Sequence, residues 1–194
     1  ALKSFCRFVQ PAKVVVVNDG TLDARDKETL AKHVPRIEIR ELNEFRSDAC
    51  PTGGCWERLL AVAHYAQDAY VIQLDSDTLT LHEPTEVINH VRNNRSFALG
   101  TWDDQEIEPM AECSARVRAK RTLTDASHIQ FVAEASFLDL DYSGDLRYVR
   151  ACAGFGGFAA GSVNLEFIER FSADMNRITG PRWRTWGSEQ VMSN

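Results

Sequence analysis

Hydrophobic runs alternate with polar breaks along the chain, and together they predict strands. Val14–Val17 is a run of four valines that ends at Asn18-Asp19-Gly20, and Tyr70–Leu74 leads directly into Asp75. Short apolar runs closed by turn residues are typical of buried strands in a parallel sheet. Weaker patterns predict further strands at 37–39, 97–99, 148–153 and 157–160, the last two around a glycine-rich bend.

Apolar residues at helical spacing predict helices between these strands. The stripe from Trp56 to Ala66 is one, and that from Leu165 to Ile178 is another, capped by Ser162 or Asn164. Further helices are expected at 26–32, 85–91, 109–120 and 127–138. Alternating strands and helices indicate an α/β fold, a Rossmann-like, mostly parallel central sheet flanked by helices.

The length of 194 residues suits one domain covering residues 1–194. The first eight residues resemble the last turns of a helix. We therefore expect a fragment that lacks a first strand and helix, and also the C-terminal end of the domain.

Composition excludes several classes of protein. The net charge of −6 argues against a nucleic-acid binder and against a polybasic membrane-surface protein. No apolar stretch has the length of a membrane span. The five scattered cysteines favour free thiols in a reducing compartment, so we expect a cytoplasmic protein.

Asp75 and Asp77 carry the main candidate chemistry, because they follow a predicted buried strand. Ligands bind at the carboxyl ends of strands in open α/β sheets. If strand geometry persists through Ser76, alternation places both carboxylates on one face. Two adjacent carboxylates repel each other unless a cation lies between them. Mg²⁺ and Mn²⁺ bind carboxylate and phosphate oxygens. A metal would let this acidic chain bind a diphosphate.

The pattern Asp-x-Asp is common in turns, and this chain contains it twice. The second copy, Asp139-Leu140-Asp141, follows a weaker segment and precedes Tyr142-Ser143-Gly144. We interpret that copy as a turn.

The chain resembles the nucleotide-sugar half of GT-A-fold glycosyltransferases. The resemblance rests on the order of its motifs: Val14–Gly20, Gly53–Trp56 and Tyr70–Leu79, followed more weakly by Ala153–Phe158 and Trp186–Gln190. It covers most of the chain, and only the Asp75–Asp77 block is specific. It implies transfer of a sugar from a nucleotide-diphosphate donor, with a UDP-sugar expected, to an acceptor hydroxyl. The metal would stabilise the leaving diphosphate.

The resemblance also implies a set of donor-binding residues: Asp19, Arg58, Asp75, Ser76, Gly156 and Gly157. Asp19, Arg58 and the two glycines each have a simpler explanation. Asn-Asp-Gly is good turn chemistry for Asp19, Arg58 suits a solvated helix face, and the glycines suit a β-bulge.

Residues near the C-terminus are candidates for acceptor binding and catalysis. Glu189 is a candidate general base, and Asp77 is counted with it as catalytic through the metal. Trp183 and Trp186 suggest packing against a sugar ring, and Trp186 is assigned to the acceptor. Asp103 and Asp104 also face the acceptor in this interpretation, or form a solvated loop. Glu189 alternatively opens a helix.

The sequence also leaves other functions open. A haloacid-dehalogenase-like phosphatase also places Asp-x-Asp after a strand, but Thr78 follows Asp77 without the spacing residue of that motif. A nucleotidyltransferase is a second alternative, and a non-catalytic carbohydrate-binding domain is a third. Nucleotide binding separates the last from the enzymes.

Overall fold

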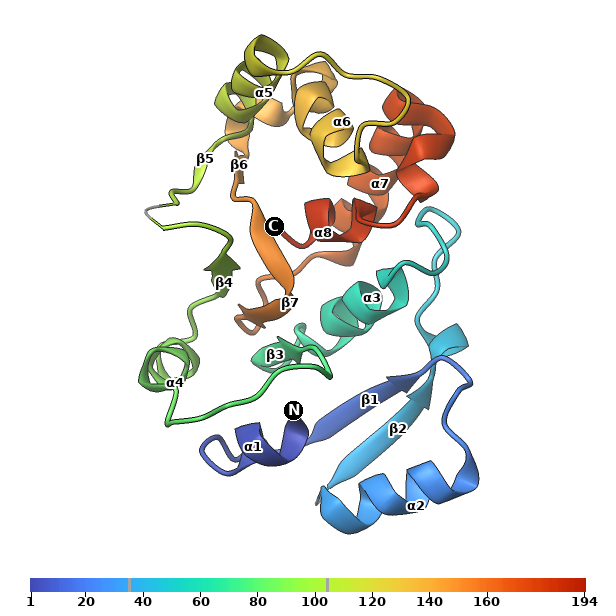
Figure 1. The fold of residues 1–194 in the computed structure, drawn as a ribbon, viewed down its shortest axis with the longest axis vertical. Helices are drawn as coiled ribbons and strands as arrows, with labels where there is room; N and C mark the ends of the chain where they lie inside the picture. The colour runs from blue at the N-terminus through green and yellow to red at the C-terminus, as the bar shows by residue number, and fades with distance from the viewer. Residues whose placement is uncertain (35, 104) are drawn as a thin grey trace. The chain divides into compact units, whose positions relative to one another are not determined.

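The computed structural model describes residues 1–34, 36–103 and 105–194, and the chain is of the α/β class, as expected (Figure 1). Two compact units make up the chain. The first unit comprises residues 1–46, 60–97 and 154–163, and the second comprises residues 47–59, 98–153 and 164–194.

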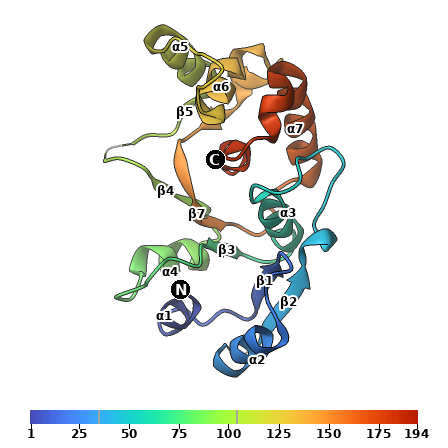
Figure 2. The same ribbon diagram turned by 45° about the vertical axis from the view of Figure 1, so that its right-hand side comes forward.

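The first unit contains a β-α-β segment. β1 (Val14–Asn18) and β2 (Ile37–Glu41) pair in parallel, and α2 (Ala24–His33) connects them. Figures 1 and 2 both show α2 beside this strand pair. Asp23 caps the helix by accepting a hydrogen bond from the Asp26 amide, while the Asp26 carboxylate accepts one from the Asp23 amide.

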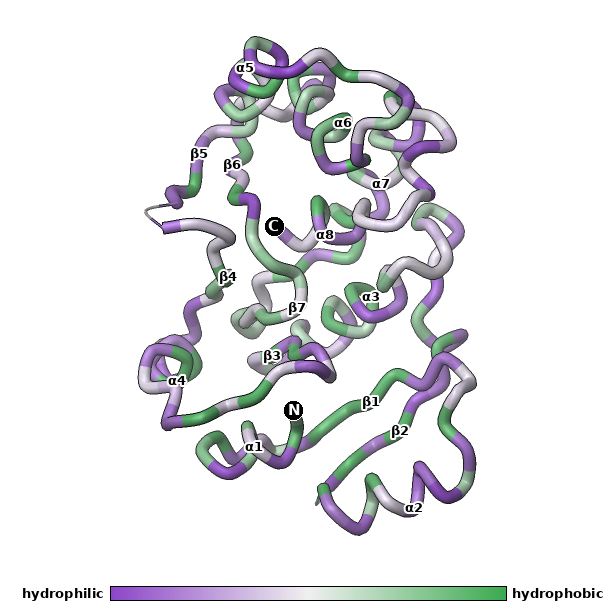
Figure 3. The backbone as a smooth tube through the Cα atoms, in the orientation of Figure 1, coloured by the Kyte–Doolittle hydropathy of each residue, from purple (hydrophilic) through white to green (hydrophobic). Residues whose placement is uncertain are grey.

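The residues of β1 are mostly apolar, which favours their burial in the first unit. Figure 3 shows hydrophobic residues along β1, and Val14 and Asn18 at its two ends are buried. The remaining elements that lie wholly in the first unit are η1 (Leu42–Glu44), β3 (Val71–Leu74), α4 (Thr85–Arg92) and α1 (Leu2–Cys6), the helix expected at the start of the chain.

A three-stranded sheet has β7 (Ala151–Phe158) between β3 and β4 (Phe97–Gly100). β3 and β7 run antiparallel, with Ile72 opposite Gly157 and Gln73 opposite Gly156. The predicted bend at the glycines is wrong, since β7 is one continuous strand. Gly156 and Gly157 pair with Gln73 and Ile72 of β3 and form no turn.

The strands form three small sheets in the described part of the chain, and one of the three is parallel. A single, mostly parallel central sheet, as the sequence predicts, is not evident. Alternation of strands and helices indicates the α/β class but does not encode the direction of pairing. Whether β7 runs parallel or antiparallel to β3 depends on the path of the chain between these two strands.

Helices dominate the second unit. α5 (Met110–Lys120) packs against α6 (Ile129–Ser136), and the short strands β5 (Glu108–Pro109) and β6 (Arg147–Tyr148) pair antiparallel. The other elements of this unit are η2 (Phe137–Asp139), η3 (Ser143–Asp145), α7 (Leu165–Thr179), η4 (Gly180–Arg184) and α8 (Ser188–Met192). The helix α3 (Trp56–Tyr65) begins in the second unit and ends in the first.

α7 begins and ends as its sequence predicts. Of the two candidate caps, Asn164 is the one used, and its side chain accepts a hydrogen bond from the Phe167 amide at 3.2 Å. Gly180 follows the last turn at φ +62°, a conformation that glycine adopts without strain.

Two further expectations concern membranes and thiols. Across the described ranges, no helix has both the length and the apolar character needed to cross a membrane. All five cysteines are free.

Candidate functional site

Asp75 and Asp77 lie where β3 ends. The Asp75 amide donates a hydrogen bond to the Gly154 carbonyl at 2.8 Å, which extends the pairing with β7 by one residue. The Asp75 carbonyl then accepts from the Thr78 amide at 3.4 Å and from the Thr78 hydroxyl at 2.9 Å. These two bonds close a turn over Ser76 and Asp77.

The turn changes one prediction about the aspartates. Strand geometry stops at Leu74, so alternation does not set the Asp75 and Asp77 side chains on one face. The cause is Thr78, whose hydroxyl and amide both fold back onto Asp75. Asp75 is half-buried, whereas Ser76 and Asp77 are exposed.

The acidic side chains at this turn have the oxygen chemistry that Mg²⁺ or Mn²⁺ prefers. No group of three or more His, Cys, Asp or Glu side chains that could hold a metal occurs among residues 1–34, 36–103 and 105–194. A magnesium ion commonly uses one or two carboxylates, with the remaining ligands from water and substrate phosphates. Asp75 and Asp77 have the oxygen ligands for that smaller contribution, and their binding of a metal stays a prediction.

Asp19 lies in the turn after β1 and is exposed. Its carboxylate accepts hydrogen bonds from the Thr21 hydroxyl at 2.6 Å and from the Thr21 amide at 3.0 Å. These two donors, the hydroxyl first, hold the pKa of the Asp19 carboxyl below its ordinary value. Asp19 therefore stabilises its own turn, and contact with a nucleotide base stays a prediction.

Gly156 and Gly157 lie on β7, beside the strand β3 that precedes Asp75, and both are buried. A Cβ on Gly157 would come within 2.2 Å of the Phe97 ring and 2.5 Å of the Tyr70 hydroxyl. At Gly156 the nearest atoms would be 3.6 Å away, an ordinary contact. Gly157 thus makes room for Phe97 and Tyr70.

We expect Gly157→Ala to lower the free energy of unfolding by about 1–3 kcal/mol, because it overpacks the contact with Phe97 and Tyr70. Gly156→Ala is the matched control on the same strand, and it should change stability by less than about 0.5 kcal/mol. Urea unfolding followed by circular dichroism measures both. Equal losses from the two variants would contradict the packing role of Gly157.

Arg58 and Glu189, both in the second unit, form an ion pair. The Arg58 guanidinium lies 3.5 Å from the Glu189 carboxylate, whose side chain is 4% exposed. The Ser193 hydroxyl also donates to Glu189, at 3.0 Å. The sequence interpretation treated Arg58 and Glu189 separately, as a donor contact and a general base, and missed their pairing.

The two tryptophans near the C-terminus have different environments. Trp183 is 1% exposed, and its indole nitrogen donates to the Ser172 hydroxyl at 3.0 Å. The idea that both tryptophans require a functional explanation is wrong for Trp183, because the core accounts for it. Trp186 is 71% exposed, with its ring edge-on to His128 at 5.8 Å.

Asp103 is exposed, as either of its interpretations requires. Asp104 lies outside the described residues. In the second Asp-x-Asp copy, Asp139 pairs with Arg118 at 2.8 Å, which agrees with a structural role.

A buried charged cluster in the second unit was missed from the sequence. Glu134 is fully buried on α6 and accepts hydrogen bonds from the Tyr148 hydroxyl at 3.1 Å and from Arg150 Nε at 2.7 Å. A second Arg150 nitrogen completes the pair. Burial, followed by the charge of Glu134, raises the pKa of Tyr148. The lone acid in the apolar helix 129–136 was the available sign.

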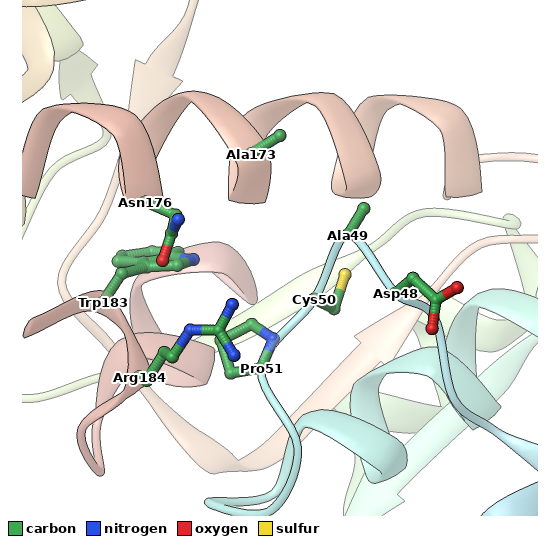
Figure 4. A pocket seen from close by; sticks show the side chains of 8 residues that line it. All are labelled: Asp48, Ala49, Cys50, Pro51, Ala173, Asn176, Trp183 and Arg184. Carbon is green, nitrogen blue, oxygen red and sulfur yellow. The ribbon is translucent and has the colours of Figure 1, made fainter. Parts of the chain in front are cut away.

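A small cavity of about 170 Å³ lies between α7 and the segment 48–51 (Figure 4). Trp183 and Arg184 line one end, and Cys50 faces it from the segment. Burial raises the pKa of the Cys50 thiol, so it is a poor nucleophile. Of the residues that the sequence linked to donor or acceptor, only the buried Trp183 is among those that line this cavity.

Within each unit, the structure brings some of the predicted residues together. In the first unit, the Asp75–Asp77 turn adjoins the β7 glycines, while in the second Arg58 meets Glu189. Comparisons with known proteins found no match to the chain among protein-family models, curated proteins or solved structures.

Proposed function

We propose that the protein is a metal-dependent glycosyltransferase of the GT-A type. It would take a sugar from a nucleoside-diphosphate donor, with a UDP-sugar expected, and transfer it to an acceptor hydroxyl. The supporting observation is the position of Asp75 and Asp77 at the end of β3, with Asp77 exposed and Asp75 half-buried. Carboxylates at the end of a strand suit a divalent ion that is shared with phosphates.

The proposed roles follow from the chemistry of each residue. Asp75 and Asp77 would hold Mn²⁺ or Mg²⁺, and when bound this ion supplies positive charge that stabilises a leaving diphosphate. The hydrogen bond from the Asp75 amide to the Gly154 carbonyl holds the backbone of Asp75 at the edge of the sheet.

On the acceptor side, we assign proton acceptance to Glu189. Arg58 and Ser193 hold its carboxylate in one orientation, as a general base requires. Trp186 exposes 71% of its surface and offers an aromatic face to an acceptor sugar.

The proposal predicts that UDP with Mn²⁺ raises the melting temperature of the wild-type protein. At a ligand concentration about 100 times Kd the stabilisation is about 2.7 kcal/mol, a shift of roughly 5–10 °C for a chain of this size. Asp77→Ala should abolish the shift, because a metal ligand is removed. Differential scanning fluorimetry measures both, with UDP in EDTA as the metal-free reference.

Asp141→Ala is the matched control. Asp141 is exposed and ends the second Asp-x-Asp copy, so its loss should leave the UDP–Mn²⁺ shift intact. If no nucleoside diphosphate raises the melting temperature of the wild type, the proposal is refuted and a non-catalytic domain is favoured. Release of phosphate from simple phosphate esters would favour the phosphatase instead.

A further inference from the structure

The second unit contains a hollow with a basic lining. Arg116, Val117 and Lys120 of α5 line it together with Arg121 and Arg150, and its volume is about 270 Å³. Every lining residue except Val117 is cationic, although the chain as a whole carries a net charge of −6. The clustering of four cations in an acidic chain requires a physical explanation.

Two of the four cations are neutralised within the protein. Arg116 pairs with Glu108, and Arg150 pairs with the buried Glu134. Lys120 and Arg121 have no carboxylate partner among the residues that the structure describes. Within the described part of the chain, two positive charges of the hollow are therefore uncompensated.

Aromatic stacking holds two of the guanidinium groups in place. The guanidinium carbon of Arg121 lies 3.7 Å from the centroid of the Phe131 ring, and that of Arg150 lies 4.6 Å from the same centroid. The stacking fixes Arg121, which has no carboxylate partner among the described residues, beside Arg150, whose charge Glu134 balances. An anion in the hollow would balance the charge of Arg121.

The helix dipole explains part of this pattern. Lys120 ends α5 and Arg121 follows it, and cations are favoured at the C-terminus of a helix. The dipole does not account for Arg150, which comes from the connection between β6 and β7. Nor does it account for a hollow lined by all four cations.

We infer that this hollow is a binding site for a phosphate group, independent of the proposed glycosyltransferase activity. Guanidinium groups match the geometry of phosphate oxygens, and Lys120 adds a point charge. A phosphate dianion would balance the two uncompensated cations. The volume is slightly below the range of about 300–1,000 Å³ typical of pockets for drug-sized ligands, which suits a small anion.

Isothermal titration calorimetry with inorganic phosphate, in low salt with EDTA, tests the site. The wild type should bind phosphate saturably, and Arg121→Gln and Lys120→Gln should each bind at least about tenfold more weakly. Both side chains are exposed, so we expect these substitutions to preserve the fold. Lys32→Gln, an equal loss of charge at an exposed position on α2, should bind as the wild type does.

The arms of the titration separate the possible ligands. Glycerol 3-phosphate binding more tightly than phosphate would identify a phosphate ester as the ligand, and equal binding would identify free phosphate. Absence of saturable heat, unchanged binding by Arg121→Gln and Lys120→Gln, or equal weakening by Lys32→Gln would overturn the inference. So would acetate competing as well as phosphate. Since EDTA removes divalent ions and Asp77→Ala should bind phosphate normally, failure of this site is distinguishable from failure of the proposed function.

Discussion

Replacing Glu134 with alanine is expected to lower the free energy of unfolding of the second unit by about 3–5 kcal/mol. The Glu134 side chain is fully buried, and it accepts hydrogen bonds from both Tyr148 and Arg150. Its removal leaves the Arg150 guanidinium, 20% exposed, without its counter-ion. All four tryptophans lie in the second unit, so urea unfolding followed by tryptophan fluorescence reports on it.

Two comparisons isolate the charge. Glu112→Ala removes an exposed glutamate from α5 and should change stability by less than about 0.5 kcal/mol. Glu134→Gln keeps an acceptor oxygen but loses the charge, so its loss should be intermediate. If Glu134→Ala costs less than about 1 kcal/mol, the ion pair with Arg150 does not stabilise the fold as we argue.

The elements that the sequence predicted well have strong local patterns. The valine run predicted β1 and the apolar stripes predicted α3 and α7, and the structure places all three at the expected residues. Capping chemistry at Asn164 and the glycine at position 180 set the two ends of α7. Such features depend on neighbours in the sequence.

Features that depend on distant residues were not predictable in the same way. The glycines of β7 suggested a bend, because a local pattern cannot show that Phe97 and Tyr70 occupy the space beside Gly157. Likewise, the antiparallel direction of β3 and β7 depends on the path of the chain between them. Residue propensity and spacing predict neither the packing beside Gly157 nor the direction in which β3 and β7 pair.

The candidate site follows the same division. Its location at the end of β3 was predictable from Tyr70–Leu74 and the aspartates that follow. The turn closed by Thr78 was not, because strand alternation was extended beyond Leu74. The pairing of Arg58 with Glu189 joins residues far apart in the sequence, so no local pattern predicts it.

Trp183→Ala is expected to cost about 3–5 kcal/mol, because the indole is 1% exposed and fills the core of the second unit. Its ring lies edge-on to Trp56 at 5.7 Å and to Phe171 at 6.0 Å. The substitution leaves a cavity and removes the hydrogen bond that the indole donates to Ser172. Urea unfolding followed by circular dichroism measures the loss.

Trp186→Ala provides the contrast, since the two tryptophans are close in sequence but differ in burial. Trp186 is 71% exposed, and its removal should change stability by less than about 0.5 kcal/mol. Under the proposed function, the same substitution should raise the KM for acceptor, because a surface for the sugar ring is lost. If Trp183→Ala were as mild as Trp186→Ala, the aromatic packing around Trp183 would not stabilise the unit, and a ligand-binding role for both rings would have to be reconsidered.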